Sequence, residues 1–295
     1  MTYIFIISTF GSARDEQFVR LINSIEGQSN PGWDILIIHV LQGKEYRYFD
    51  IGCSIQCSNV QYIAASDLGI GLSRGRNIGL DILESTNTNL DYCTLFFSDD
   101  DCFYPAAFIE TFREIQSGND KLAVAGLVLD ESGSYALGYS SERGEHFVTR
   151  RKIFRNISSV NFGVPYNDFR FDEDFGIGAN YYSCEEFDYV LRRLSNGLVM
   201  RYNSDLFVCH PDMTKTLSYK VFLLKVFKNS IGHGAYFRKN FGVDSFYYVF
   251  VNPFLSSVKN LCLLDYKNVT GAFVGFFGRV FGFFIYPWKS VVKCQ

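Results

Sequence analysis

The stretch Leu95-Phe96-Phe97-Ser98-Asp99-Asp100-Asp101 joins an apolar run to three consecutive carboxylates. The run covers residues 93–97, with Thr94 as its one polar member, and its short, aromatic character predicts a buried strand. An ionised carboxylate is unfavourable to bury without a partner, so the acids are expected at the exit of this strand, in a cleft or in water. Because ligands of open α/β sheets bind at the carboxyl ends of the strands, this exit is a candidate ligand site.

Two of these acids have the chemistry of metal ligands. Asp99 and Asp101 project from alternate positions and offer hard oxygen atoms, which suit Mg²⁺ or Mn²⁺ carrying substrate phosphates. The alternative is a solvated acidic turn, since short motifs of this kind also occur without a function. The rest of the chain decides between the two interpretations.

The opening of the chain predicts a β-α-β unit. Apolar runs at residues 3–7 and 34–41 flank a segment, 15–25, whose apolar residues recur at helical spacing. This order of elements implies a parallel sheet covered by helices. A helix is also expected over 106–116, a strand over 122–129, and loops of a variable binding face over 131–160.

Charge is distributed unevenly along the 295 residues. Residues 1–213 contain 17 Lys and Arg against 29 Asp and Glu, a balance of −12, and residues 214–295 contain 11 against two, a balance of +9. A basic tail on an acidic body suggests that the tail meets an anionic partner, such as a membrane surface or nucleic acid. The alternative is that the tail docks on the acidic body itself.

The eight cysteines and the first ten residues exclude two other classes. The cysteines show no CxxC pair and no paired Cys/His spacing, so a zinc site is not expected. Scattered cysteines of this kind fit a protein of a reducing compartment. Residues 1–10 lack a positive leading segment and a long apolar stretch, so they are interpreted as a first strand and not as a signal peptide.

A glycine- and arginine-rich stretch, Gly71-Leu72-Ser73-Arg74-Gly75-Arg76-Asn77-Ile78-Gly79-Leu80, precedes the acidic strand exit. Ser73 is expected to cap a helix here, which places Arg74 and Arg76 near the helix N-terminus. Cations are unfavourable at that end unless an anion binds, and a phosphate beside Arg76 would meet this need. An ordinary surface helix with exposed arginines is the alternative.

A second acidic cluster lies further on. It reads Phe171-Asp172-Glu173-Asp174-Phe175-Gly176-Ile177-Gly178-Ala179-Asn180 and then Ser183-Cys184-Glu185-Glu186-Phe187-Asp188. Its glycines and Asn180 indicate a loop with unusual backbone angles. Crowded carboxylates raise one another's pKa, which favours a general base. Alternatively, Ser183 and Glu186 form a capping box that opens a helix over 187–194.

The C-terminal part combines aromatic, glycine and basic residues. Over residues 270–288, glycines recur at helical spacing and phenylalanines cover much of the rest. Arg279 and the glycines weaken the prediction of a membrane-spanning helix, whereas Trp288, Lys289 and Lys293 fit an interfacial helix. The alternative is a hairpin of helices packed on the protein through the glycines.

Five segments, taken together, resemble the inverting family 2 glycosyltransferases of the GT-A fold, especially bacterial members that build surface polysaccharides. The segments are Gly71 to Gly79, Phe97 to Asp101, Phe171 to Ala179, Ser183 to Asp188, and Val208-Cys209-His210. The resemblance implies a Rossmann-like, mostly parallel sheet flanked by helices. A GT-A catalytic domain would cover 1–213, with a nucleotide-sugar half (1–105) and an acceptor half (106–213), followed by a basic helical region, 214–295.

The resemblance also implies roles for particular residues. Asp99 and Asp101 would hold a divalent Mn²⁺ or Mg²⁺ ion, with His210 reaching the metal and the diphosphate. Glu186 would be the catalytic base, in a motif shared with Glu185 and Asp188. The donor would meet Thr9, Gln42, Arg76, Asn77, Asp99 and Asp100, and the acceptor would meet Tyr181 and Tyr182.

The sequence departs from the family pattern at three places. Residues 39–43 read His-Val-Leu-Gln-Gly where family members commonly carry Asp-Asp-Gly-Ser. The resemblance therefore does not identify the nucleotide base of the donor. Thr9-Phe10 replaces the usual proline after the first strand, and Cys184 stands where many relatives have glycine.

The implied function is a metal-dependent, inverting transfer of a sugar from a nucleotide-sugar to a saccharide or lipid-linked saccharide, in the cytoplasm at the inner face of the cell membrane. A sugar nucleotidyltransferase would carry a glycine-rich, basic loop after the first strand, and residues 8–14 contain one Gly and one Arg. A non-catalytic scaffold or carbohydrate-binding subunit is the other alternative. A nucleic-acid partner is not expected, because the tail contains no known binding module.

Overall fold

The computed structural model describes residues 1–10, 15–43, 55–135, 143–211, 217–255, 258 and 266–287. The chain forms two compact units. The first, here called the sheet unit, contains residues 1–171 and 189–212, and the second, the helical unit, contains 172–188 and 213–295. The acidic segment 172–188 therefore belongs with the C-terminal helices.

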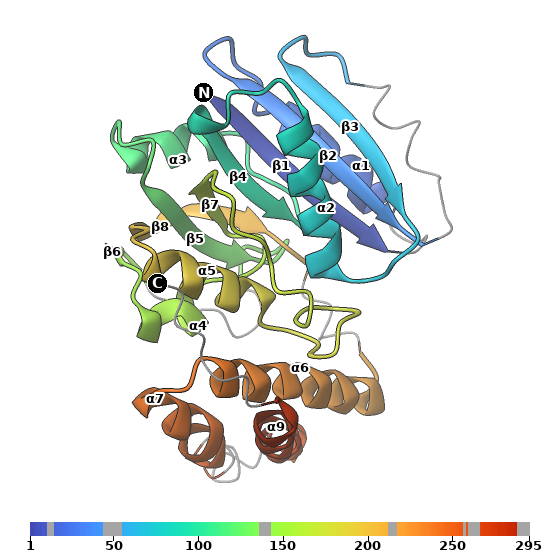
Figure 1. The fold of residues 1–295 in the computed structure, drawn as a ribbon, viewed down its shortest axis with the longest axis vertical. Coiled ribbons are helices and arrows are strands. Elements are labelled where there is room, and N and C mark those ends of the chain that lie inside the picture. Colours follow the sequence, from blue (N-terminus) through green and yellow to red (C-terminus); the bar gives the residue numbers. More distant parts are fainter. Residues whose placement is uncertain are drawn as a thin grey trace. The chain divides into compact units, whose positions relative to one another are not determined.

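The helices and strands occur in a mixed order (Figure 1). The strands are β1 (Thr2–Phe10), β2 (Asp34–Gln42), β3 (Val60–Asp67), β4 (Cys93–Ser98), β5 (Ala123–Leu129), β6 (Glu145–Phe147), β7 (Phe162–Pro165) and β8 (Met200–Cys209). The helices are α1 (Asp15–Glu26), α2 (Leu72–Ser85), α3 (Phe108–Gln116), α4 (Ile153–Asn156), α5 (Glu185–Ser195), α6 (Tyr219–Lys239), α7 (Val243–Phe246) and α9 (Tyr266–Ile285). Short 3₁₀ turns occur at Leu90–Tyr92 and Arg150–Lys152, and a π-helical turn occurs at Tyr247–Val251.

The described strands form one eight-stranded sheet in the order β3-β2-β1-β4-β7-β5-β8-β6. β1 is parallel to β2 and β4, β2 to β3, and β5 to β8, while β7 runs antiparallel between β4 and β5. The parallel register sets Thr2 beside both Asp34 and Cys93. The carboxyl ends of β1, β2 and β4 consequently share one edge of the sheet, and the predicted mostly parallel α/β fold is confirmed.

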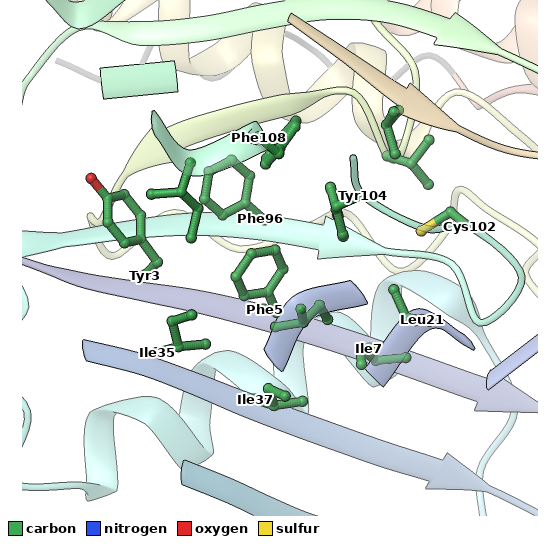
Figure 2. Close-up of a cluster of buried hydrophobic side chains, with 14 of the residues drawn as sticks. Tyr3, Phe5, Ile7, Leu21, Ile35, Ile37, Phe96, Cys102, Tyr104 and Phe108 are labelled. Atoms are coloured by element: carbon green, nitrogen blue, oxygen red, sulfur yellow. The ribbon is translucent and has the colours of Figure 1, made fainter. Parts of the chain in front are cut away.

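The main core lies on the face of the sheet that α1 and α3 cover (Figure 2). Successive side chains of a strand point to opposite faces, and Tyr3, Phe5 and Ile7 of β1 all point to this one. The Phe5 and Phe96 rings stack with their centroids 5.0 Å apart, and the ring of Phe108 from α3 lies 5.4 Å from Phe96. Packing of these aromatic rings fixes β4, and so the position of the acids that follow it.

Two glycines let α2 pack closely on the other face of the sheet. A Cβ atom at Gly79 would lie 2.4 Å from Cγ2 of Ile6, and one at Gly75 would lie 2.0 Å from Oγ of Ser8. Such distances are too short for any side chain. The glycines of the 71–79 motif therefore bring the start of α2 against the ends of β1 and β2.

Several elements differ from the sequence-based expectations. β1 extends to Phe10, and α5 begins at Glu185 and not at residue 187. Residues 131–160 contain a short strand and a short helix, β6 and α4, because each pairs or packs with an element distant in the sequence. β7 was not predicted, since its four residues are too few to show alternation. No helix in the described part of the chain has the length and apolar character needed to cross a membrane.

His39, in the segment that departs from the family pattern, is a buried residue of β2. Its Nδ1 lies 2.6 Å from the Tyr62 hydroxyl and its Nε2 lies 2.9 Å from Oγ1 of Thr9. The Phe18 ring covers the imidazole at a centroid distance of 4.4 Å. Burial lowers the pKa of His39 to about 3, so the side chain is neutral at physiological pH.

This buried histidine predicts a loss of stability in mild acid. The unfolded chain protonates His39 near pH 6.5, whereas the folded protein does so near pH 3, so the unfolded state binds more protons between these values. We expect the free energy of unfolding to fall by about 2 kcal/mol from pH 7 to pH 5 through this residue. Urea unfolding of the wild type and of His39→Gln at both pH values measures it. Equal pH dependence in the two proteins would contradict the prediction.

Candidate active site

Asp99 leaves β4 among positively charged and hydroxyl groups of the sheet unit. Arg76 of α2 donates from Nη2 to Oδ1 of Asp99 at 3.1 Å, and the Ser159 hydroxyl donates to Oδ2 at 3.0 Å. Burial alone would raise the pKa of Asp99, but the hydrogen bond from His210 and the charge of Arg76 outweigh it and lower the pKa to about 2. Asp99 is therefore an ionised carboxylate held in a fixed position.

His210 meets the acids because β8 ends beside the turn that follows β4. Backbone hydrogen bonds join Phe103 and Cys209 in both directions, at 2.9 and 3.0 Å, and set His210 against that turn. The Nε2 atom of His210 lies 3.2 Å from Oδ1 of Asp101 and 3.7 Å from Oδ2 of Asp99. Although burial opposes protonation, hydrogen bonds to the two carboxylates raise the pKa of His210 to about 10. The structure thus brings together three of the residues predicted from separate motifs.

The donor types of Asp99, Asp101 and His210 fit the predicted Mn²⁺ or Mg²⁺ ion. Neighbouring ligand atoms around an octahedral ion lie about 3 Å apart, and the two His210–carboxylate distances, 3.2 and 3.7 Å, approach this spacing. Among the described residues, no group of three such side chains is already arranged around a metal position. In this arrangement His210 faces both carboxylates as their hydrogen-bond donor, and a divalent ion would replace its proton.

The two arginines near the start of α2 pair with carboxylates. Arg76 is buried, and its guanidinium lies over the rings of Phe97 and Phe171. Arg74 pairs with Asp67, at the end of β3, through Nε at 2.6 Å. The hydrogen bond from Arg74 has the largest effect on the pKa of the Asp67 carboxyl, and it lowers that pKa. The alternative of exposed arginines holds for Arg74 and is wrong for Arg76, and a carboxylate that follows or ends a neighbouring strand pairs with each.

The start of α2 also corrects a predicted cap. The helix begins at Leu72 with Gly71 as its N-cap, and no side chain caps it. Ser73 lies within the first turn and is buried. Gly71 has a φ of 153°, which favours glycine, so the helix begins two residues earlier than a Ser73 cap would allow.

Three predicted donor-binding residues have partners within the protein. Oγ1 of Thr9 lies 2.9 Å from His39, and Oε1 of Gln42 accepts from the Gly71 backbone N–H at 3.3 Å. The Asn77 amide exchanges two hydrogen bonds with the backbone of Phe171. Asn77 therefore fixes the chain that leads into the acidic segment, and its contact with a donor stays a prediction, as does that of Asp100.

The acidic segment of the helical unit is organised around Lys239, at the end of α6. Its Nζ lies 2.6 Å from Oδ2 of Asp172 and 2.7 Å from Oδ1 of Asp188. Asp188 is fully buried, and Asn240 donates to the same oxygen at 3.4 Å. A lysine of the basic tail thus joins the loop after Phe171 to the first turn of α5, as the alternative of tail docking on acidic residues anticipated.

Glu185 and Glu186 occupy the first turn of α5, where the helix dipole favours carboxylates. Both are buried. The preceding residue, Cys184, has a φ of 75°, a left-handed conformation that disfavours side chains with a Cβ. Glycine adopts this angle without that cost. The Ser183 hydroxyl donates to the Asn229 carbonyl at 2.8 Å, so it anchors the turn to α6.

The two tyrosines predicted to meet the acceptor differ in environment. Tyr181 is buried, and its ring lies 5.3 Å from Phe175 and 5.1 Å from Tyr286. Tyr182 is half-buried, with the Lys228 ammonium 5.2 Å from its ring centre. Tyr182 is the better placed of the two for a saccharide, and both contacts stay predictions.

Sequence reasoning missed Ser159, Asp67 and Lys239 as residues of these clusters. Each is an isolated polar residue with no motif around it, and each meets its partner only through the fold. Lys239 had one available signal, since an acid-rich segment of the body and an acid-poor tail are natural partners.

Solved structures with the same fold are known. The structure of S. aureus TarS residues 1–349 aligns over 95% of this chain and 90% of its own, with a TM-score of 0.55 and 13% identity. The same fragment in complex with UDP aligns with a TM-score of 0.54 and 12% identity, over 95% of this chain and 90% of its own. The complex of this fragment with UDP-GlcNAc aligns with a TM-score of 0.51 and 12% identity, over 95% of this chain and 91% of its own. No family model and no curated protein sequence matches the chain. The chain has a GT-A-like glycosyltransferase fold.

The left-handed angle at Cys184 predicts an unusual order of stability. Alanine keeps the strain of a Cβ at positive φ, whereas glycine removes it. We expect Cys184→Gly to be more stable than Cys184→Ala by about 1 kcal/mol, as measured by urea unfolding. At ordinary backbone angles alanine is the more stable of the two, so that order would contradict the observed conformation.

The pairing of Lys239 predicts a large effect of its removal. Lys239→Met takes the cation away from the fully buried Asp188, and we expect a loss of about 3 kcal/mol in the free energy of unfolding. The double variant Lys239→Met/Asp188→Asn removes the buried charge as well and should recover part of the loss. Strictly additive losses in urea unfolding would show that the two residues do not interact.

Proposed function

We propose that the chain is a metal-dependent, inverting glycosyltransferase of the family 2 type. It would move a sugar from a nucleotide-sugar donor to a hydroxyl of a saccharide or lipid-linked saccharide in cell-surface polysaccharide synthesis. The observation that supports this most is the meeting of Asp99, Asp101, Arg76 and His210 at the carboxyl edge of the sheet. The same fold in TarS has been solved with UDP and with UDP-GlcNAc.

The donor half of the proposed site lies in the sheet unit. Asp99, Asp101 and His210 would hold Mn²⁺ or Mg²⁺, which supplies positive charge against that of the departing diphosphate. Arg76 adds a fixed positive charge beside Asp99. Gln42 and Asp67, at the ends of β2 and β3, would face the base of the donor. Thr9, Asn77 and Asp100 complete the proposed donor contacts.

The proposed base and acceptor residues belong to the helical unit. Glu186 would take the proton of an acceptor hydroxyl as its oxygen forms a bond to the anomeric carbon. The bond from that carbon to the diphosphate breaks on the opposite face, and its electron pair leaves with the nucleoside diphosphate. A single displacement of this kind inverts the anomeric configuration. Lys239, through Asp188, would fix the turn that carries Glu185 and Glu186.

Nucleotide binding tests the donor site directly. We expect one of UDP, GDP, CMP and TDP to bind in the presence of Mn²⁺ and to be released by EDTA, as measured by calorimetry. Asp101→Asn should weaken this binding by at least about tenfold, because a metal ligand is lost. Asp91→Asn, an exposed acid on a turn before β4, is the matched control and should bind as the wild type does.

A second measurement separates binding from chemistry. Glu186→Gln should bind the nucleotide normally and transfer sugar about 10²- to 10⁴-fold more slowly, because the general base is absent. Absence of nucleotide binding by the folded wild type would overturn the proposal and favour a scaffold or carbohydrate-binding subunit.

A further inference from the structure

The helical unit carries a row of exposed phenylalanines along α9. Phe273, Phe277, Phe281 and Phe284 follow one another at intervals of four, four and three residues, which is the spacing of one helix face. Their exposed fractions are 44%, 62%, 51% and 70%. The row extends for about 16 Å at the rise of an α-helix. Large apolar residues gathered in this way mark an interaction surface.

The opposite face of α9 holds the helix in place. Gly271, Gly275, Gly278 and Gly282 recur at intervals of four, three and four residues and lie against α6. A Cβ atom at Gly282 would be 2.0 Å from the Ile231 carbonyl oxygen, so the backbones touch. The glycines therefore fix α9 on α6 and leave the phenylalanine row exposed, with Phe281 at its edge toward α6.

The one charged residue within residues 269–285 does not interrupt the row. Arg279 donates from Nη1 to the Tyr248 carbonyl at 2.9 Å, and its burial lowers its pKa. Its charge is directed to the π-helical turn. The arginine that weakened the prediction of a membrane-spanning helix is thus turned inward.

The helix that packs against α9 carries exposed lysines. α6 packs along α9, with the Phe227 ring 6.4 Å from that of Phe281. The exposed part of α6 contributes Lys220, Lys225 and Lys228 together with exposed Val221 and Leu224. Neither helix contains an Asp or a Glu. The two packed helices therefore contribute exposed aromatic side chains and positive charge, and neither helix contributes a carboxylate.

We propose that this surface, the phenylalanine row of α9 with the lysines of α6, binds the headgroup region of a membrane that contains anionic phospholipids. Phenylalanines enter the interface and lysines meet the phosphate groups. A second copy of the chain fits less well, because the same surface would set lysines against lysines with no carboxylate on either helix. The inference extends the proposed function, since it would hold the enzyme where a lipid-linked acceptor lies. Trp288, Lys289 and Lys293, predicted as interfacial anchors, lie outside the described residues.

Vesicle flotation with the full chain tests the proposal. We expect the wild type to float with vesicles of equal parts phosphatidylglycerol and phosphatidylcholine, and less at high salt. Phe277→Ser/Phe284→Ser should weaken the partition by about 100-fold, because two exposed rings no longer insert. Phe147→Ser is the matched control, since Phe147 is 56% exposed on β6 of the sheet unit.

A charge variant tests the second half of the surface. Lys220→Gln/Lys225→Gln should lower binding to the anionic vesicles by about 30-fold and leave binding to pure phosphatidylcholine unchanged. This variant leaves the α6–α9 contact intact, so it remains informative if the phenylalanine variant does not fold.

Three results would overturn the proposal. The wild type could fail to float with anionic vesicles, or both surface variants could float as the wild type does. Thirdly, the wild type could fail to bind vesicles while the phenylalanine variant sediments with half the mass of the wild type. This result would assign the surface to contact with a second copy. Nucleotide binding is measured separately on the same proteins, so failure of the proposed catalytic function is distinguished from failure of the membrane contact.

Discussion

The pairing of buried carboxylates with positive charge controls the arrangement of the candidate site. Asp101 is 3% exposed and Asp99 is largely covered, and neither position would be stable without a nearby cation. Arg76 reaches Asp99 from α2, and His210 reaches both acids from the end of β8. These contacts need the sheet order that brings β8 to the turn after β4.

Close packing of glycine governs where these groups stand. At Gly75 and Gly79, α2 lies so near β1 that Arg76 is carried into the interior beside Asp99. The glycines of α9 do the same for α6, whose far end presents Lys239 to the acidic segment. The sequence predicted a helix for both motifs, with packing through the glycines as one alternative for the second. In the structure both glycine motifs lie at contacts where a side chain would not fit.

The helical unit is thereby more than an appendage to a catalytic domain. Asp172 and Asp188 belong to it, and their shared lysine joins a loop, the first turn of α5 and the end of α6. The left-handed Cys184 bends the chain directly before Glu185 and Glu186 and is stabilised by its neighbours, including the Ser183 contact with α6. A unit that fixes the proposed base and also exposes an aromatic, basic surface would couple the position of the reaction to the position of its acceptor.

The sequence by itself determined the parallel sheet, most of its strands and the acids at the exit of β4, because apolar period and strand exits are local properties. His210 was singled out only by the family resemblance. The family resemblance marked Cys184 as a departure from glycine, and the φ of 75° at this residue is a backbone angle that favours glycine. Only the tertiary structure decided that Arg74 pairs with Asp67, that Lys239 joins Asp172 to Asp188, and that Tyr181 is buried. Those facts depend on contacts between residues far apart in the chain, and an isolated polar side chain carries no local pattern that identifies its partner.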